Sequence, residues 1–162
     1  MLSPPKPSAC NTSSFSRRNV HAGFSLVELM VALAVAGILF FVALPGYQYA
    51  VLKAARAAAR ATLLEVTARQ EQYFINNKVY AADLGALGLP ATYFIDNQGD
   101  TVGEQRASYR ISLELTEGKY RGVRAVPLNR QAVDSACLAF SLSRLGVRAV
   151  SGALSANPAQ CW

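Results

Sequence analysis

The chain has 162 residues, of which 52% are apolar and 16% charged, and its formal net charge is +6. This length suits one ordinary domain, and the composition excludes a disordered chain, a collagen-like repeat and a disulfide-dense miniprotein. The apolar excess indicates a very large core or a membrane segment. A single histidine, His21, disfavours imidazole-based catalysis, and three cysteines cannot form a zinc site without a fourth ligand.

The apolar residues are concentrated between Phe24 and Leu44, where 18 of 21 positions are apolar. A helix over this run is about 31 Å long, which matches the hydrocarbon core of a bilayer. A buried core helix is disfavoured because the run is apolar on every face. A signal peptide is disfavoured because its apolar region is shorter and ends at a small-residue cleavage site. The run therefore predicts a retained membrane anchor.

The flank before this run predicts its orientation. Lys6, Arg17 and Arg18 precede it with no acidic residue, so the positive-inside rule places the N-terminus in the cytoplasm. The remainder then faces an oxidising compartment. The first 22 residues are rich in Ser, Pro and Asn and have no periodicity, so they are expected to carry no fold.

The segment 47–76 is rich in good helix formers, and Asn76-Asn77 is predicted to end the helix. One stripe of this segment is mostly apolar and is expected to pack on a small globular head, while the opposite stripe is charged. The packing stripe comprises Leu52, Ala55, Ala59, Thr62, Leu63, Val66 and Tyr73, and the charged stripe comprises Lys53, Arg56, Arg60 and Glu71.

Strand patterns follow a loop that is rich in turn residues. Apolar residues alternate with polar ones from Tyr109 to Leu115, and Glu117-Gly118 is a predicted turn into a strand over 120–126. A third strand is expected with Leu138, Phe140 and Leu142 on one face, and a short fourth near 147–150. The sequence predicts an α+β fold, in which a long helix covers one face of an antiparallel meander of three or four strands.

The stretch Gly23-Phe24-Ser25-Leu26-Val27-Glu28-Leu29-Met30 resembles the prepilin signature of type IV pilins and type II secretion pseudopilins. The resemblance implies the type IV pilin fold, with cleavage by prepilin peptidase between Gly23 and Phe24 and N-methylation of Phe24. It divides the chain into a leader (1–23), an apolar helix that serves as membrane anchor and filament core (24–45), and a globular head (46–162). Cleavage removes three cations and the only histidine.

Three residues of the apolar helix have expected roles. Glu28 is either a carboxylate that reaches the lipid headgroups or, as the resemblance favours, the partner of the Phe24 amine in the same or a neighbouring subunit, which would set the register between helices. Pro45 lacks an N–H and is expected to kink or loosen the helix, while Gly37 lowers helix stability nearby. In the family, the interval between such residues tends to melt on assembly.

Cys137 and Cys161 are expected to form a disulfide, because the compartment is oxidising and closing this loop stabilises the fold by about 3 kcal/mol. The resemblance implies that the loop belongs to the exposed face of the head. Arg144 and Arg148 lie between these cysteines, where there is no Asp or Glu.

The segments Arg69–Phe74, Asp134–Cys137 and Cys161-Trp162 resemble, more weakly, the PilE-type minor pilins of type IVa pili. The resemblance implies a structural subunit, most simply a minor pilin that supports pilus assembly. The alternatives are a major pilin and a type II secretion pseudopilin. The subunit would wait in the inner membrane with its head in the periplasm and then enter the extracellular pilus. Implied partners are other pilins and minor pilins, prepilin peptidase, the inner-membrane assembly platform and the membrane.

A DNA-uptake receptor on the same scaffold is a further alternative, because some pilins have that role and a patch of Arg144, Arg148 and the basic residues before them could contact phosphates. We favour protein contact for the loop, since strand-surface arginines usually form a solvated face and Glu104, Glu114 and Glu117 interrupt the basic positions. The other basic residues of the head that precede the loop are Arg106, Arg110, Lys119, Arg121, Arg124 and Arg130.

Enzymatic activity is not expected. The processed chain holds no histidine for a Ser/His/Asp or Cys/His arrangement, and no phosphate-binding Gly-Lys-Ser/Thr loop or metal-ligand cluster occurs in the sequence. We therefore expect no catalytic residue, metal or cofactor.

Overall fold

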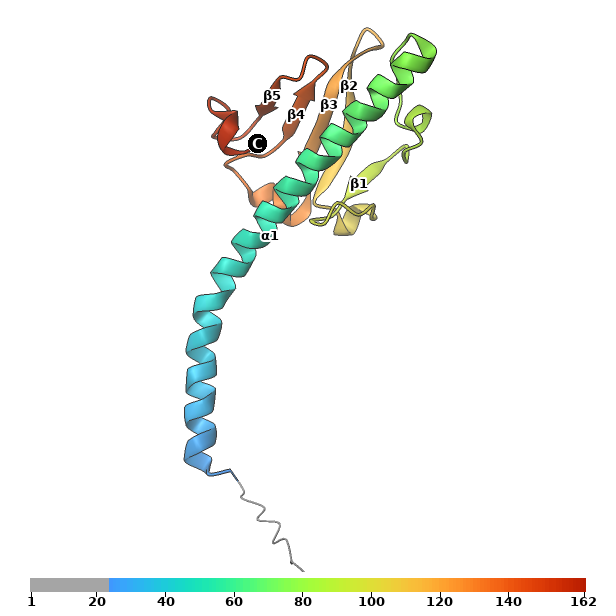
Figure 1. Ribbon diagram of the computed structural model, residues 1–162. Helices are drawn as coiled ribbons and strands as arrows, with labels where there is room; N and C mark the ends of the chain where they lie inside the picture. The colour runs from blue at the N-terminus through green and yellow to red at the C-terminus, as the bar shows by residue number, and fades with distance from the viewer. Residues whose placement is uncertain (1–23) are drawn as a thin grey trace, which may run out of the picture. The chain divides into compact units, whose positions relative to one another are not determined.

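The computed structural model describes residues 24–162, which fall into two compact units, one up to Phe40 and one from Phe41 to Trp162. The predicted leader (1–23), including Gly23 and the cations used to predict orientation, lies outside the described residues. A single helix, α1 (Leu26–Asn77), runs through both units (Figure 1). Its last residue confirms the predicted helix end at Asn76-Asn77.

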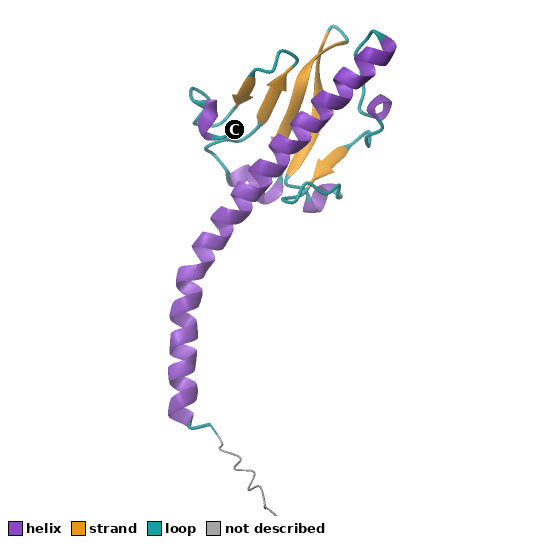
Figure 2. Cartoon of the chain, viewed as in Figure 1, coloured by secondary structure: helices purple, strands orange, loops and turns teal. Residues whose placement is uncertain are grey.

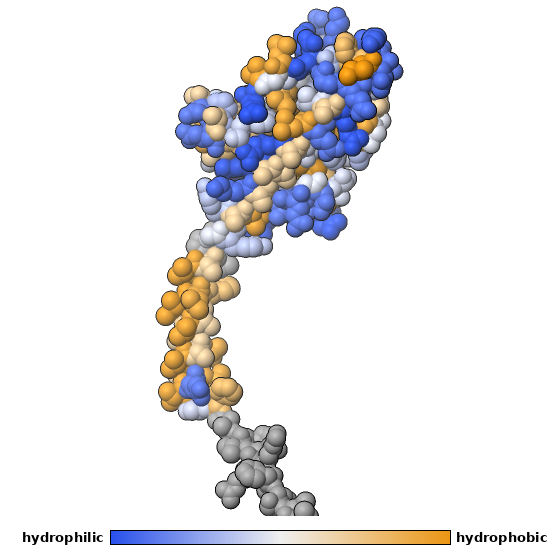
Figure 3. Space-filling model, in the orientation of Figure 1, coloured by the Kyte–Doolittle hydropathy of each residue, from blue (hydrophilic) through white to orange (hydrophobic). Residues whose placement is uncertain are grey.

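The described part of the first unit belongs mostly to α1, and apolar side chains cover most of the face seen in Figure 3. These side chains are exposed, Leu33 and Phe40 among them. Within the described residues, α1 is the helix with the length and composition to cross a membrane. The helix is unbroken at Gly37 and at Pro45. Loosening of this interval stays a prediction for the assembled filament.

The second unit contains an antiparallel sheet of five strands in sequential order (Figure 2). The strands are β1 (Tyr93–Ile95), β2 (Tyr109–Thr116), β3 (Lys119–Pro127), β4 (Phe140–Ser143) and β5 (Arg148–Val150). The α+β architecture is as predicted, but the expected count of three or four strands is wrong. The missed strand, β1, has only three residues and lies within the turn-rich loop, where its edge pairing with β2 leaves no periodic pattern.

Two details of the strands follow from backbone conformation. Glu117 and Gly118 both have positive φ, 53° and 73°, as a two-residue turn between twisted antiparallel strands requires, which confirms the predicted turn. Leu138 was expected in a strand, and that expectation is wrong. Its φ of 50° is left-handed, so the extended backbone of β4 begins only at Phe140.

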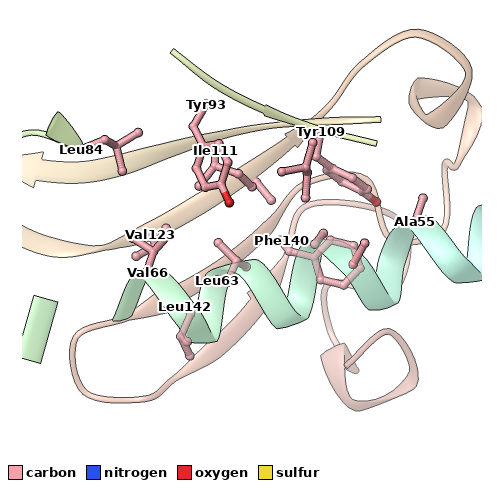
Figure 4. Close-up of a cluster of buried hydrophobic side chains, with 14 of the residues drawn as sticks. Ala55, Leu63, Val66, Leu84, Tyr93, Tyr109, Ile111, Val123, Phe140 and Leu142 are labelled. Carbon is pink, nitrogen blue, oxygen red and sulfur yellow. The ribbon is translucent and has the colours of Figure 1, made fainter. Parts of the chain in front are cut away.

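The core lies between α1 and one face of the sheet (Figure 4). Ala55, Ala59, Leu63 and Val66 from the predicted packing stripe are fully buried, and they pack in one cluster with sheet residues such as Phe140. Alanines at this contact have no bulk to hold the helix away from the strands, so α1 approaches the sheet closely. The described core thus confirms this part of the stripe.

Arg56 is not on a solvent face, contrary to the expectation from the charged stripe. Its Nε donates to Asp134 Oδ2 at 2.7 Å and its Nη2 to Asp134 Oδ1 at 2.6 Å, with side chains only 16% and 2% exposed. The hydrogen bond to Asp134 raises the pKa of Arg56. Gln131 Nε2 also donates to Asp134 Oδ2, at 3.3 Å, and to the Tyr109 hydroxyl, at 3.1 Å. This network holds α1 against the segment that leads to Cys137.

Replacement of Asp134 by Asn should lower the free energy of unfolding by about 3 kcal/mol, because it leaves a largely buried guanidinium without its counter-charge. Glu65→Gln is the matched control. It breaks the exposed Arg69–Glu65 pair one helical turn apart and should cost at most about 0.5 kcal/mol. Denaturant unfolding of both variants measures the difference, and equal costs would mean that the Arg56–Asp134 pair is no more than a surface contact.

Candidate functional site

The loop between Cys137 and Cys161 is closed by the disulfide that the sequence predicted, with 5.9 Å between the two Cα atoms. Backbone bonds tie the loop back to its start, from Gly152 N to Cys137 O at 3.1 Å and from Leu154 N to Ala136 O at 3.0 Å. The loop contains β4 and β5, so the disulfide also fixes the edge of the sheet that carries Arg144 and Arg148.

A groove of about 450 Å³ lies where three segments meet: the chain leaving α1, the β2–β3 turn and the β4–β5 turn. We call it the basic groove. Its cationic lining residues come from all three segments and are Lys78, Lys119, Arg121 and Arg144. Its aromatic lining residues are Phe74, Tyr80 and Tyr120.

The aromatic side chains of the basic groove form a continuous wall. The rings of Phe74 and Tyr80 are stacked with centroids 4.6 Å apart, and Tyr120 lies 5.2 Å from Tyr80. The guanidinium of Arg144 lies 5.6 Å from the centre of the Tyr80 ring, a cation–π contact that limits its rotamers. Burial raises the pKa of Tyr120, which keeps this phenol neutral. The contact with this aromatic wall therefore restrains the side chain of Arg144, one of the four cations of the groove.

The charge of the basic groove is not neutralised by ion pairs within the described residues. The ion pairs there are Arg56–Asp134, Arg69–Glu65 and Arg124–Glu114, and none includes a groove cation. The acids beside the groove are Glu71, which accepts a hydrogen bond from Tyr80 at 3.2 Å, and Glu117 next to Gly118. Four cations against two acids leave a positive surface, which suits a polyanion.

The predicted pair of loop arginines is separated in the structure. Arg144 lines the basic groove, but Arg148 lies 5.5 Å from the Trp162 ring and is not part of the lining. The cations that join Arg144 come from elsewhere. Lys119 and Arg121 belong to the basic patch noted in the sequence. Lys78 was missed, because no local pattern links the end of a helix to a distant hairpin.

Two family models match this chain. One, described as "Type IV minor pilin ComP, DNA uptake sequence receptor", covers residues 45–141, and the other, a prokaryotic N-terminal methylation motif, covers residues 18–44. The chain belongs to the ComP family of type IV minor pilins. The fimbrial protein EcpC of Eikenella corrodens is 35% identical over 75 residues, which are 46% of this chain and 49% of that protein. The chain thus spans about half the length of this relative.

Membership of the ComP family favours the minor-pilin prediction over the major-pilin and pseudopilin alternatives. It also confirms the expected type IV pilin fold. Pilins are structural subunits that associate with other pilins after prepilin processing, and the methylation motif fits a membrane-anchored pilin that later joins the pilus. The described residues of the motif include the first turn of α1, where Glu28 lies. The cleavage and methylation at Gly23 and Phe24, and the role of Glu28, stay predictions.

The placement of Arg121 beside Arg144 depends on a close approach between β3 and β4. A Cβ on Gly122 would lie 2.6 Å from the Leu142 carbonyl oxygen, and the neighbouring Arg121 carbonyl accepts a 2.7 Å hydrogen bond from Arg144 N. Gly122→Ala should therefore destabilise the minor pilin by about 1–3 kcal/mol. Gly103→Ala, with no atom near its added Cβ, should change stability by less than about 1 kcal/mol. Thermal unfolding of both variants tests this, and equal melting temperatures would contradict it.

Proposed function

We propose that this minor pilin is a DNA receptor that presents the basic groove to duplex DNA from the pilus. The observation that carries the proposal is the convergence of Lys78, Lys119, Arg121 and Arg144 from three segments onto one groove, without ion-pair partners among the described residues. Phosphate contacts supply most of the affinity for DNA, and they need cations that do not already form ion pairs with carboxylates.

The acids that argued against DNA binding in the sequence lie mostly elsewhere. Glu114 pairs with Arg124 at 3.2 Å, and Glu104 precedes β2 at the end of the strand away from the β2–β3 turn. Of the three acids, only Glu117 adjoins the basic groove. The family description, which names a DNA uptake sequence receptor, supports the same function. Within this proposal, Lys119 next to the hairpin turn is the residue best placed to reach into a DNA groove, while Lys78, Arg121 and Arg144 hold phosphates.

The rest of the proposal concerns assembly. Prepilin peptidase would cut between Gly23 and Phe24 and methylate Phe24, and the subunit would wait in the inner membrane with its head in the periplasm. The inner-membrane assembly platform would then insert it among other pilins. Glu28 lies in the first turn of α1 and is the one charged residue of the apolar run 24–44, so pairing with the Phe24 amine of a neighbouring subunit would fix the axial register. No catalytic activity is proposed.

The full-length processed protein in detergent micelles should bind a fluorescent duplex oligonucleotide, with a Kd of about 10⁻⁶ M or below at physiological salt. Arg121→Gln/Arg144→Gln should weaken binding at least about tenfold and reduce the slope of log K against log salt concentration by about 1.8, since each lost phosphate contact contributes about 0.9. Arg110→Gln/Arg148→Gln removes the same charge from exposed arginines outside the groove and should weaken binding less than about twofold.

Fluorescence anisotropy over a salt series measures both quantities. Equal losses in the two double variants would show that binding follows net charge and not the basic groove. No change in anisotropy on titration with the wild-type protein would contradict the receptor proposal. The groove would then be assigned to contacts with other proteins.

Glu28→Ala should reduce incorporation into filaments severalfold, while membrane insertion and the fold of the head remain, because the helix becomes more apolar and loses only its polar register contact. Glu28→Asp keeps the charge and should incorporate better than Glu28→Ala. The ratio of pilin in sheared filaments to pilin in membranes, by immunoblot, measures the effect. Normal incorporation of Glu28→Ala would assign Glu28 to the lipid headgroups instead.

A further inference from the structure

A second cleft, of about 440 Å³, lies at the opposite end of β2 and β3 from the basic groove. We call it the basal cleft. It is lined by residues 47–52 of the second unit's helix, by Asn97 after β1, by the segment just before β2 and by the segment just after β3. Because β2 and β3 have eight and nine residues, the two clefts are separated by roughly 26 Å along the strands. All the residues of the basal cleft belong to the second unit.

The basal cleft combines cations with exposed apolar surface. Its charged lining residues are Arg106 and Arg130, both exposed. Besides Asp134, which pairs with Arg56, the acids next to its lining residues are Glu104 and Asp96, and Asp96 accepts backbone hydrogen bonds within its own loop. Asn129 joins the two segments that carry these arginines, because its side-chain amide donates to the carbonyl of Glu104 at 2.8 Å and to that of Ala107 at 2.9 Å. The cleft therefore offers two guanidinium groups held on connected segments.

The apolar part of this surface is formed by Tyr47 and Val133, whose side chains are 67% and 74% exposed. Neither residue is needed in the core of the head, and both border the cleft that holds the arginines. Exposed apolar side chains in the same cleft as two cations are complementary to a lipid, with acyl chains beside the apolar residues and an anionic headgroup on the guanidinium groups.

The helical side of the basal cleft begins at the depth of lipid headgroups. Tyr47 follows the end of the apolar run, Leu44, by three residues, and Val51 follows it by seven, so a helix rises about 4.5 Å and about 10 Å to reach them. The headgroup layer is roughly 5–7 Å thick on each side of the hydrocarbon core. Tyr47 and Tyr49 also fit the aromatic residues found at this interface. When the apolar run spans a membrane, the helical side of the cleft therefore begins at the headgroup layer.

We propose that the basal cleft binds the phosphate headgroup of an anionic phospholipid through Arg106 and Arg130 while the pilin resides in the membrane. The occupant is a membrane lipid and not DNA, since the helix residues that line the cleft directly follow the apolar run and the cleft is at the far end of the strands from the basic groove. Extraction into a filament must then break these headgroup contacts, so the cleft favours the membrane-resident state over the assembled one. The inference is independent of DNA binding.

The test uses the full-length processed protein in detergent, titrated with phosphatidylglycerol or with phosphatidylcholine of the same acyl chains, and native mass spectrometry counts the lipid adducts. The wild type should retain phosphatidylglycerol preferentially. Arg106→Gln/Arg130→Gln should reduce this preference by about 25-fold, or about fivefold for each arginine. Arg121→Gln/Arg144→Gln, which removes equal charge from the basic groove, should keep the preference and lose DNA binding instead.

Arg106→Lys/Arg130→Lys keeps the charge and should retain most of the preference, which keeps the test valid if the glutamine variant proves unstable. Equal preference in the wild type and the glutamine variant would overturn the proposal, as would equal losses in the two glutamine double variants. Displacement of the lipid by inorganic phosphate at matched concentration would show a site for small anions and not for a lipid. A dimer peak lost only in Arg106→Gln/Arg130→Gln would assign the cleft to contact between copies of the chain.

Discussion

The close packing of α1 on one face of the sheet is the contact on which the head depends. Ala55 and Ala59 present almost no side chain at this interface, so the helix backbone comes near the strands, and Leu63 and Val66 fill the space further along. Because the helix covers that face and continues to Asn77, its end reaches the β2–β3 turn. The start of the same helical segment borders the other end of the strands. Both clefts of the head are therefore consequences of one helix–sheet contact.

The pairing of Arg56 with Asp134 extends this contact to the C-terminal part of the chain. The sequence pattern predicted that Arg56 is exposed to solvent, whereas the structure pairs it with Asp134. The pair holds the segment just before Cys137 against α1. The disulfide then closes the loop that contains β4 and β5. A groove built from three separate segments needs such restraints, since Arg144 on the β4–β5 turn contributes only if that turn stays beside Tyr80.

The features that the sequence predicted well are those with a local physical signal. Helix periodicity predicted the buried stripe, and turn propensity predicted the Glu117-Gly118 hairpin. The disulfide between Cys137 and Cys161 was predicted from the expectation of an oxidising compartment. The failures have a common cause in contacts between distant residues. β1 is too short to show a period, and Arg56 is stabilised by a residue 78 positions away. The basic groove was missed for the same reason, because its cations are scattered from Lys78 to Arg144 along the chain.

The distribution of charge shows why a linear count of acids and bases is a poor guide to binding in this pilin. Asp134, Glu65 and Glu114 each neutralise an arginine that takes no part in either cleft. The cations that remain without such partners among the described residues include those at the two ends of β2 and β3. Local potential depends on charges within about one Debye length, roughly 10 Å, so each end acts separately from the net charge of the chain. A head with a small excess of positive charge can thus carry two distinct cationic surfaces, one suited to a nucleic acid and one to a membrane.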